Sequence, residues 1–214
     1  MYVPGHFQAD PAEVEELLHT HGAADLITLT ADGRLLATTL PFVYVPVAGE
    51  PGALHGHLAR NNPQWNAPAR GEALVIVHGP DAYITPSWYA STAEHGWVVP
   101  TWDYVAAQVY GSLVVHEDPA WTEALVRRLV AKHEASSGHP HPWSVDDAPA
   151  DFTAGMMRAI VGVELQISHV EAAVKLSQNR PTADVAGVIA GLRARGDTAA
   201  ADAVQQANAA LPAG

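Results

Sequence analysis

Hydrophobic and polar positions alternate along the first half of the chain in a pattern that predicts β-strands. Residues 25–30 alternate in this way, and the following Asp32-Gly33 is typical of a two-residue hairpin turn. A long extended segment is predicted next, over 34–47, interrupted by two prolines. Further strands are predicted over 53–58, 73–78, 108–116 and 160–170.

Helices are predicted where apolar residues recur every three or four positions. Asp10-Pro11-Ala12-Glu13 has the composition of a helix start, and Asp118-Pro119 precedes the most amphipathic stretch of the chain. The end of the chain predicts an alanine-rich helical hairpin with few large apolar side chains, which we expect to pack on the rest. The other predicted helices cover 151–158 and, within the hairpin, 182–195 and 197–211 on either side of Gly196.

About six strands with few helices between them favour a mainly β, α+β fold. We expect an antiparallel barrel with helices at its ends, because a doubly wound sheet would need a helix between successive strands. The predicted organisation is one domain over 1–180 and the helical hairpin, packed on it, over 181–214.

Composition and charge exclude several classes of protein. The 214 residues include 23 acidic and 11 basic side chains, for a formal charge of −12, so neither charge-driven DNA binding nor a polybasic membrane anchor is expected. Without cysteine, the chain has no disulfide, thiolate nucleophile or Cys-ligated metal. It shows no secretory leader and no apolar run of about 18 residues, so we expect a cytoplasmic protein without a membrane partner.

The motifs of the common nucleotide and hydrolase sites are missing. The sequence has no G-x-G-x-x-G, no glycine followed by lysine and no G-x-S-x-G. Its twelve histidines include three pairs one residue apart, of which His55 and His57 are the best placed, on a predicted strand. No third ligand set accompanies them at recognisable spacing, so we predict no metal site.

Two short segments combine cations with other hydrogen-bond donors. Arg60 ends the string HLAR and is followed by Asn61 and Asn62, while Lys175 and Arg180 bracket the string KLSQNR. Guanidinium, ammonium, amide and hydroxyl groups together suit a phosphorylated small molecule. A helix cap with surface ion pairs explains the same spacing equally well.

Aromatic side chains are concentrated between residues 83 and 110. Core filling is the usual explanation for such density, but several of these side chains stand beside prolines in loops, which favours a dimer interface or a site for a planar ring. The set comprises Tyr83, Trp88, Tyr89, Trp97, Trp102, Tyr104 and Tyr110.

These strings, in this order, resemble the PaiB family of FMN-binding split-barrel proteins, whose members are described as negative transcriptional regulators. The matching pieces are MYVP at 1–4 with His6-Phe7, GHLARNNPQW at 56–65, GPDAYITPSWY at 79–89, VPTWDY at 99–104, Tyr110-Gly111, Trp143-Ser144 and KLSQNR at 175–180.

The resemblance implies a six-stranded antiparallel split β-barrel, related to pyridoxamine-phosphate oxidase, that forms a homodimer with FMN in clefts between subunits. Backbone groups of Thr38, Thr39 and Leu40 would face the flavin ring, and the turn from Arg60 would hold the phosphate. The full set of cofactor-binding residues that it implies is Thr38, Thr39, Leu40, His57, Arg60, Asn61, Asn62, Tyr83, Ser87, Trp88, Trp102, Lys175, Gln178, Asn179 and Arg180.

Three functions stay open on this basis: an FMN-binding protein with or without oxidoreductase activity, a regulator that acts through a protein partner, and a haem-binding or haem-degrading protein with His57 as an axial ligand. No side chain identifies itself as a general acid or base. The chain departs from the family pattern at Thr85, Gln108 and Asp103, where the family usually has Ser, His and Asn respectively. A carboxylate at 103 would lower flavin affinity if it faced the cofactor.

Overall fold

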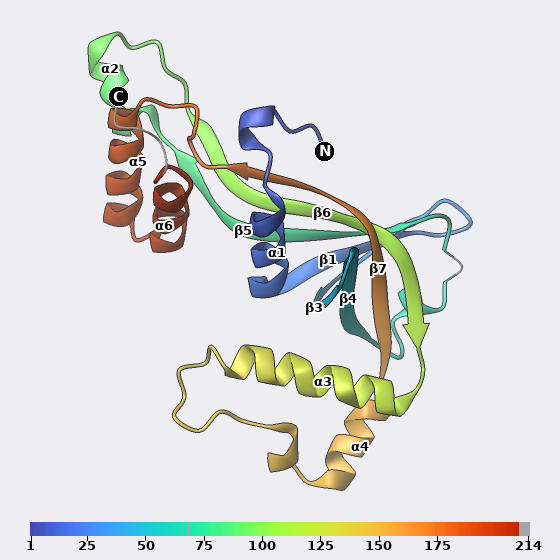
Figure 1. The fold of residues 1–214 in the computed structure, drawn as a ribbon. Helices are drawn as coiled ribbons and strands as arrows, with labels where there is room; N and C mark the ends of the chain where they lie inside the picture. Colours follow the sequence, from blue (N-terminus) through green and yellow to red (C-terminus); the bar gives the residue numbers. More distant parts are fainter. Residues whose placement is uncertain (68, 210–214) are drawn as a thin grey trace. The chain divides into compact units, whose positions relative to one another are not determined.

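The computed structural model describes residues 1–67 and 69–209, which divide into two compact units (Figure 1). Unit 1 comprises Met1–Val14, His78–Ala107 and Glu171–Gly214, of which the last five residues lie outside the described part. Unit 2 comprises Glu15–Val77 and Gln108–Val170. Each unit is described by itself.

The described chain contains seven strands and six α-helices. The strands are β1 (Ala23–Leu29), β2 (Leu35–Pro41), β3 (Val43–Val47), β4 (Glu50–Ala59), β5 (Ala73–Ile84), β6 (Thr101–His116) and β7 (Ile160–Lys175). The α-helices are α1 (Pro11–Thr20), α2 (Ala90–Glu94), α3 (Pro119–Glu134), α4 (Ala150–Arg158), α5 (Thr182–Arg195) and α6 (Thr198–Ala207). Short 3₁₀ helices are η1 (Gly5–Phe7), η2 (Pro63–Trp65), η3 (Pro86–Trp88) and η4 (Val145–Asp147). Among the described residues, none of the helices is both long and apolar enough to span a bilayer.

The expected six-stranded antiparallel split barrel is not what the structure shows: the sheet has seven strands and is not a closed barrel. Its order is β2-β1-β5-β6-β7-β4-β3, with registered antiparallel pairs at both ends. The segment 34–47, expected to continue as one extended stretch, divides at the fully buried Phe42. Before Phe42 the chain pairs with β1 and after it with β4, so β2 and β3 become the two edge strands.

The predicted strands exist, but several are longer than expected, three of them by five residues or more at one end. β5 runs six residues past the predicted end at 78, β6 begins seven residues before 108, and β7 continues five residues past 170. Gly111 in β6 permits the close approach of β7, because a Cβ there would lie 2.1 Å from the Gln166 carbonyl oxygen. The α+β class is confirmed, with an antiparallel sheet and helices in comparable amounts.

Unit 2 is held by apolar side chains on alternate positions of its strands and on one face of α3. Burying each of these contributes about 1.5–3 kcal/mol relative to an exposed position. The largest fully buried ones are Leu18, Leu26, Phe42, Leu54, Leu58, Val75, Leu125 and Leu165.

Unit 1 has its own core, in which the α5–α6 hairpin packs on residues from β5, β7 and the segment after η3. Gly196, with φ of 90°, ends α5 as predicted. The predicted end of the second helix at Leu211 lies outside the described residues, and the boundary between 1–180 and 181–214 stays a prediction. The core comprises Ala82, Ile84, Tyr89, Val174, Leu176, Val185, Val188, Leu192, Ala200, Ala201 and Val204.

A partly buried cation ties helix α3 to two other segments of unit 2. Lys132 of α3 donates to the carbonyl oxygens of His21 (2.9 Å) and Phe42 (3.2 Å). His21 is itself buried, and its Nδ1 lies 2.6 Å from the Leu18 carbonyl, which can only accept. Nδ1 must therefore carry a hydrogen. Burial, and then the charge of Lys132, lower the pKa of His21 from 6.5 to about 4.

We expect His21 to make unit 2 less stable in mild acid. The unfolded chain binds a proton on His21 near pH 6.5 and the folded chain only near pH 4. The unfolded state therefore gains protons first as the pH falls, and the free energy of unfolding should decrease by up to about 3 kcal/mol between these pH values. In His21→Asn, which keeps a donor for Leu18, this part of the decrease should disappear in urea unfolding measured from pH 7.5 to 4.5.

The matched control is His19→Asn, which removes an exposed histidine two residues away. It should follow the wild-type pH dependence. A His21→Asn protein with the wild-type slope would contradict the assignment of a neutral His21.

Candidate functional site

The fifteen residues implied as cofactor-binding divide between the two units, and each group is described within its own unit. Seven lie in unit 2: Thr38, Thr39, Leu40, His57, Arg60, Asn61 and Asn62. Eight lie in unit 1: Tyr83, Ser87, Trp88, Trp102, Lys175, Gln178, Asn179 and Arg180.

In unit 2, the turn after β4 is fixed by a buried glutamine. The Gln64 side chain is 3% exposed, and its amide nitrogen is shared among the Leu26 carbonyl, the Thr28 hydroxyl and the Leu36 carbonyl at 3.1–3.3 Å. Its oxygen accepts from the Thr38 hydroxyl at 2.6 Å. Gln64 therefore ties η2 to β1 and β2.

Asn62 completes this network rather than facing outward. Its Oδ1 accepts from the Gln64 backbone N–H (2.9 Å), which caps η2, and its Nδ2 donates to the Thr38 hydroxyl (3.0 Å). The side chains of Asn62 and Thr38 thus hold the turn. On strand β2 the hydroxyl of Thr39 is also engaged, donating to Asp25, and Leu40 is buried against Gly56.

The Arg60 guanidinium is partly engaged within the protein and partly free to bind a ligand. It donates to the carbonyls of Arg158 (3.0 Å) and Ile160 (3.1 Å) and pairs with Glu117 at 3.1 Å. It therefore caps the C-terminal end of α4, where cations are favoured. A guanidinium has five N–H groups; three are engaged, so two remain for a ligand.

Beside Arg60 the surface is hollowed. An open cavity of about 510 Å³ is lined by Ala59, Arg60, Asn61, Arg158 and Ala159. The Asn61 and Arg158 side chains are exposed and make no hydrogen bond or ion pair within the described chain. Sequence analysis missed Arg158, because it lies on a helix about 100 positions away from Arg60.

His57, on β4, is half-buried and its Nδ1 has no hydrogen-bond partner among the described residues. Burial lowers the pKa of His57, so the imidazole is neutral at pH 7. Two neighbouring histidines are arranged differently: His116 lies 2.7 Å from Glu164, while His55 contacts Arg128. No group of three or more metal-ligating side chains occurs in residues 1–67 and 69–209.

In unit 1, the Lys175 ammonium is engaged by β6. It donates to the Thr101 hydroxyl and to the Trp102 carbonyl, both at 2.5 Å. The Trp102 ring is 52% exposed, donates to Asp81 at 2.7 Å and lies 6.1 Å from the ring of Tyr83. These two aromatic rings form an exposed pair that is suited to contact with a planar group.

The turn that follows Lys175 is built on a buried carboxylate. Ser177 adopts a left-handed conformation, with φ of 63°, and its hydroxyl donates to Asp103 at 2.6 Å. Both residues are at most 2% exposed, and burial raises the pKa of Asp103. Asp103 therefore holds this turn from inside unit 1.

The other members of the turn differ in availability. Gln178 is engaged through both ends of its amide, with the Leu176 N–H and the Val174 carbonyl. The Arg180 guanidinium stacks 4.6 Å from the ring centre of Tyr89. Asn179 is exposed and makes no side-chain hydrogen bond in the described chain, so it and Arg180 are the two members with donors to spare.

Trp88 packs on helix α5. A Cβ at Gly191 would lie 2.3 Å from its indole ring, and a Cβ at Gly187 would lie 1.9 Å from its carbonyl oxygen. The guanidinium of Arg195 covers the ring at 5.0 Å. Trp88 thus docks α5 through two glycines four residues apart, while Ser87 beside it is exposed.

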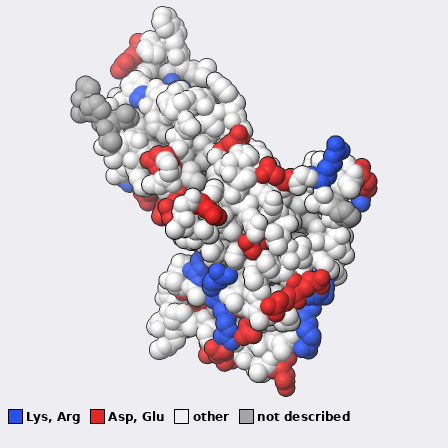
Figure 2. Space-filling model, turned by 45° about the vertical axis from the view of Figure 1, so that its right-hand side comes forward, with Lys and Arg blue, Asp and Glu red and all other residues white. Residues whose placement is uncertain are grey.

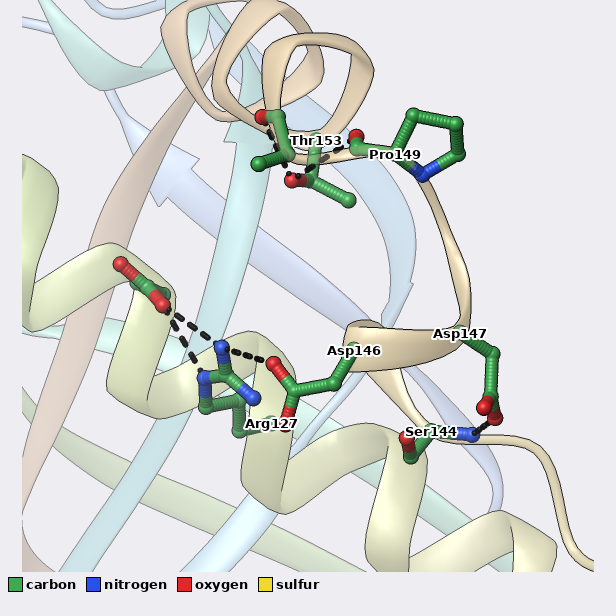
Figure 3. A network of polar contacts seen from close by, with 8 residues as sticks. Arg127, Ser144, Asp146, Asp147, Pro149 and Thr153 are labelled. Carbon is green, nitrogen blue, oxygen red and sulfur yellow. Dashed lines mark hydrogen bonds and ion pairs between the residues drawn. The ribbon is translucent and has the colours of Figure 1, made fainter.

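A second pocket of unit 2 was not anticipated from the sequence. It encloses about 610 Å³ between α3, η4 and α4. Figure 3 shows Arg127 of α3 beside Asp146 of η4, and its guanidinium also bonds Glu123. Two carboxylates thus surround the cation, and the rest of the wall is mostly alanine, proline, valine and methionine. Arg158 also lines this pocket, so the Arg127 cation is paired with carboxylates while the second arginine is not, within the described chain.

Comparisons with known proteins agree with this architecture. The family model described as "Putative FMN-binding domain" matches residues 1–169. The chain is 32% identical over 190 residues to the protease synthase and sporulation protein PAI 2 of Bacillus subtilis, which covers 88% of this chain and 87% of that protein.

Two solved structures share the fold. The conserved hypothetical protein Rv2991 from Mycobacterium tuberculosis gives a TM-score of 0.56 at 11% identity, covering 85% of this chain and 94% of that one. The flavocytochrome Anf3 from Azotobacter vinelandii gives 0.53 at 14% identity, covering 78% and 67% respectively. At these identities the likeness shows the fold alone.

The packing of Trp88 predicts opposite effects for two glycine-to-alanine changes. Gly187→Ala places a Cβ against the Trp88 backbone and should lower the free energy of unfolding by about 1–3 kcal/mol. Gly155→Ala on α4 meets only the Arg158 side chain at 3.8 Å and should raise it by about 0.5–1 kcal/mol. Urea unfolding followed by tryptophan fluorescence measures both, and equal effects would contradict the proposed role of Gly187.

Asp103 predicts a second stability effect. Because its pKa is raised in the folded state, the folded chain binds the proton more tightly than the unfolded chain, and stability is lost as the pH rises from about 4. Asp103→Asn, which keeps an acceptor for Ser177, should therefore be more stable than the wild type at pH 8 and lose that advantage near pH 4. Ser177→Gly keeps the backbone conformation but removes the donor, and should cost about 1.5–3 kcal/mol at pH 8. A difference between Asp103→Asn and the wild type that does not change with pH would contradict this account.

Proposed function

This chain belongs to the family of FMN-binding domains and is a homologue of the PAI 2 protein, and we propose that it binds FMN through the hollow beside Arg60. Its resemblance to the PaiB family is thereby confirmed. The observation that carries the proposal is the donor set of unit 2: Arg60 keeps two free N–H groups and opens, with the exposed Asn61, onto one cavity.

These residues fit a phosphate group. Guanidinium and amide N–H groups are the donors that bind phosphate oxygens, and the cavity of about 510 Å³ lies within the usual range of ligand sites. No carboxylate lines this cavity, although the protein carries 23 of them. The charge of Glu117 is neutralised by Arg60 itself. An anion can therefore bind here against the overall charge of −12.

Strand β2 supports the place of the flavin ring that the resemblance implies. It is an edge strand of the sheet, so one side of its backbone has no strand partner within the described chain. Backbone N–H and C=O groups of Thr38, Thr39 and Leu40 would hydrogen-bond the polar edge of the ring. The network of Gln64 fixes their position, because it joins Thr38 to the phosphate-binding turn.

A bound flavin would supply the electron or hydride transfer, and the protein would supply orientation and electrostatics. The side chains of unit 2 described above bind or position; none is placed as a proton donor. We therefore propose a flavin-binding protein in which access to the flavin ring decides which molecule exchanges electrons with it. A homodimer, as in the family, is part of this proposal, and the exposed pair Tyr83–Trp102 is the surface that supports it.

A regulatory role is the second proposal. The charge distribution argues against direct binding to DNA. Figure 2 shows Lys and Arg side chains lying among Asp and Glu on the face drawn, without a continuous basic surface there. Two chains would carry 2 × −12 = −24. A regulator of this composition would act through a protein partner or through the chemistry of its flavin.

The proposal is tested by flavin titration. The purified protein, or the protein reconstituted with FMN, should show a flavin spectrum and bind FMN more tightly than riboflavin, which lacks the phosphate. Arg60→Gln should weaken FMN binding by about 10–100-fold through the loss of a charged phosphate contact, and leave riboflavin binding unchanged.

Arg34→Gln is the matched control, because it removes an exposed, ion-paired arginine of the same unit. It should bind FMN like the wild type. Unfolding curves of Arg60→Gln separate a weakened site from a weakened fold. A protein that takes up neither flavin would refute the proposal, and a Soret band on haem titration that His57→Ala abolishes would favour the haem alternative.

A further inference from the structure

We propose that Arg158 is a second phosphate-binding arm of the hollow beside Arg60 and sets the preference for a phosphorylated flavin. The inference rests on the proposed FMN binding and adds a residue from α4 to the turn that the family motif marks. Arg158 lies outside every string that carries the resemblance to the family.

The backbone places Arg158 beside the turn. Arg60 donates from Nε to the Arg158 carbonyl at 3.0 Å, and the Arg60 backbone N–H donates to the next carbonyl, that of Ala159, at 2.8 Å. Two independent hydrogen bonds thus fix the end of α4 against the end of β4. Both arginines line the same cavity, with Asn61 between strand and helix.

The Arg158 side chain is free to serve a ligand. It is exposed, and no hydrogen bond or ion pair of its guanidinium occurs within the described chain. Its Nη2 lies near Gly155, 3.8 Å from where a Cβ would be, so the guanidinium rests back along its own helix. All its N–H groups remain available, whereas Arg60 has three of five engaged.

The helix end would by itself repel an anion, because the last carbonyls of a helix carry partial negative charge. Arg60 offsets part of this effect, because its guanidinium binds the Arg158 carbonyl and its backbone N–H binds the carbonyl of the C-cap residue Ala159. Arg158 lines this cavity as well as the larger pocket between α3, η4 and α4, and its unpaired guanidinium is exposed, so it can turn from Gly155 toward a ligand beside Arg60. Its planar fork matches two oxygens of a phosphate monoester, a group that FMN has and riboflavin lacks.

The test compares Arg158→Gln with Arg34→Gln, each titrated with FMN and with riboflavin by flavin fluorescence. Arg158 is exposed and partly screened by solvent, so Arg158→Gln should weaken FMN binding by about 3–10-fold and leave riboflavin binding unchanged. Arg158→Lys should recover part of the loss. Added salt should reduce the difference between wild type and Arg158→Gln, because an exposed charge pair is screened.

The outcomes separate this inference from the proposal beneath it. FMN binding by the wild type, with an unchanged FMN-to-riboflavin ratio in Arg158→Gln, overturns the role of Arg158 alone. Equal losses for both flavins also overturn it, because the residue would then act on the ring or on the fold. A wild type that binds neither flavin overturns the proposed function and this inference together. Circular dichroism of Arg158→Gln should match the wild type, since the side chain makes no contact that folding needs.

Discussion

The arrangement of unit 2 depends on the burial of one neutral amide. Gln64 is almost inaccessible to water, so each of its polar atoms must find a partner inside the protein or cost about 1–3 kcal/mol. The partners that it finds belong to β1, to β2 and to the hydroxyl of Thr38. The turn that carries Arg60 and Asn61 therefore cannot shift without breaking a hydrogen-bond set that spans two strands.

The residues of the family motifs separate by what their side chains do. Thr38, Asn62 and Gln178 are engaged in internal hydrogen bonds, and Trp88 is a packing residue. Their contribution to a ligand would come through the backbone that they position. Arg60 and Asn61 retain donors, so a short motif holds both the groups that build the turn and the groups that a ligand can reach.

Local patterns were sufficient for most elements. The hairpin around Asp32-Gly33 and the helix that ends at Gly196 are encoded within a few residues, and both occur where predicted, although the turn between β1 and β2 is longer than the two residues expected. The division at Phe42 was not predictable, because β2 and β3 have the same local pattern and differ only in their distant partners. Arg158 was not predicted as a site residue for the same reason, because the sequence around it does not indicate that it lies beside the end of β4.

The position of Arg60 at the end of α4 couples two equilibria. The same guanidinium binds the carbonyl of Arg158, the last residue of the helix, and lines the cavity, so an anion that draws it outward competes with the helix end for its N–H groups. Thermodynamic reciprocity then requires that fraying of α4 alters the affinity of the cavity as much as occupancy alters the fraying. The stability of the last turn of this helix would then change with ligand concentration. Hydrogen-exchange rates of its backbone amides would report that change.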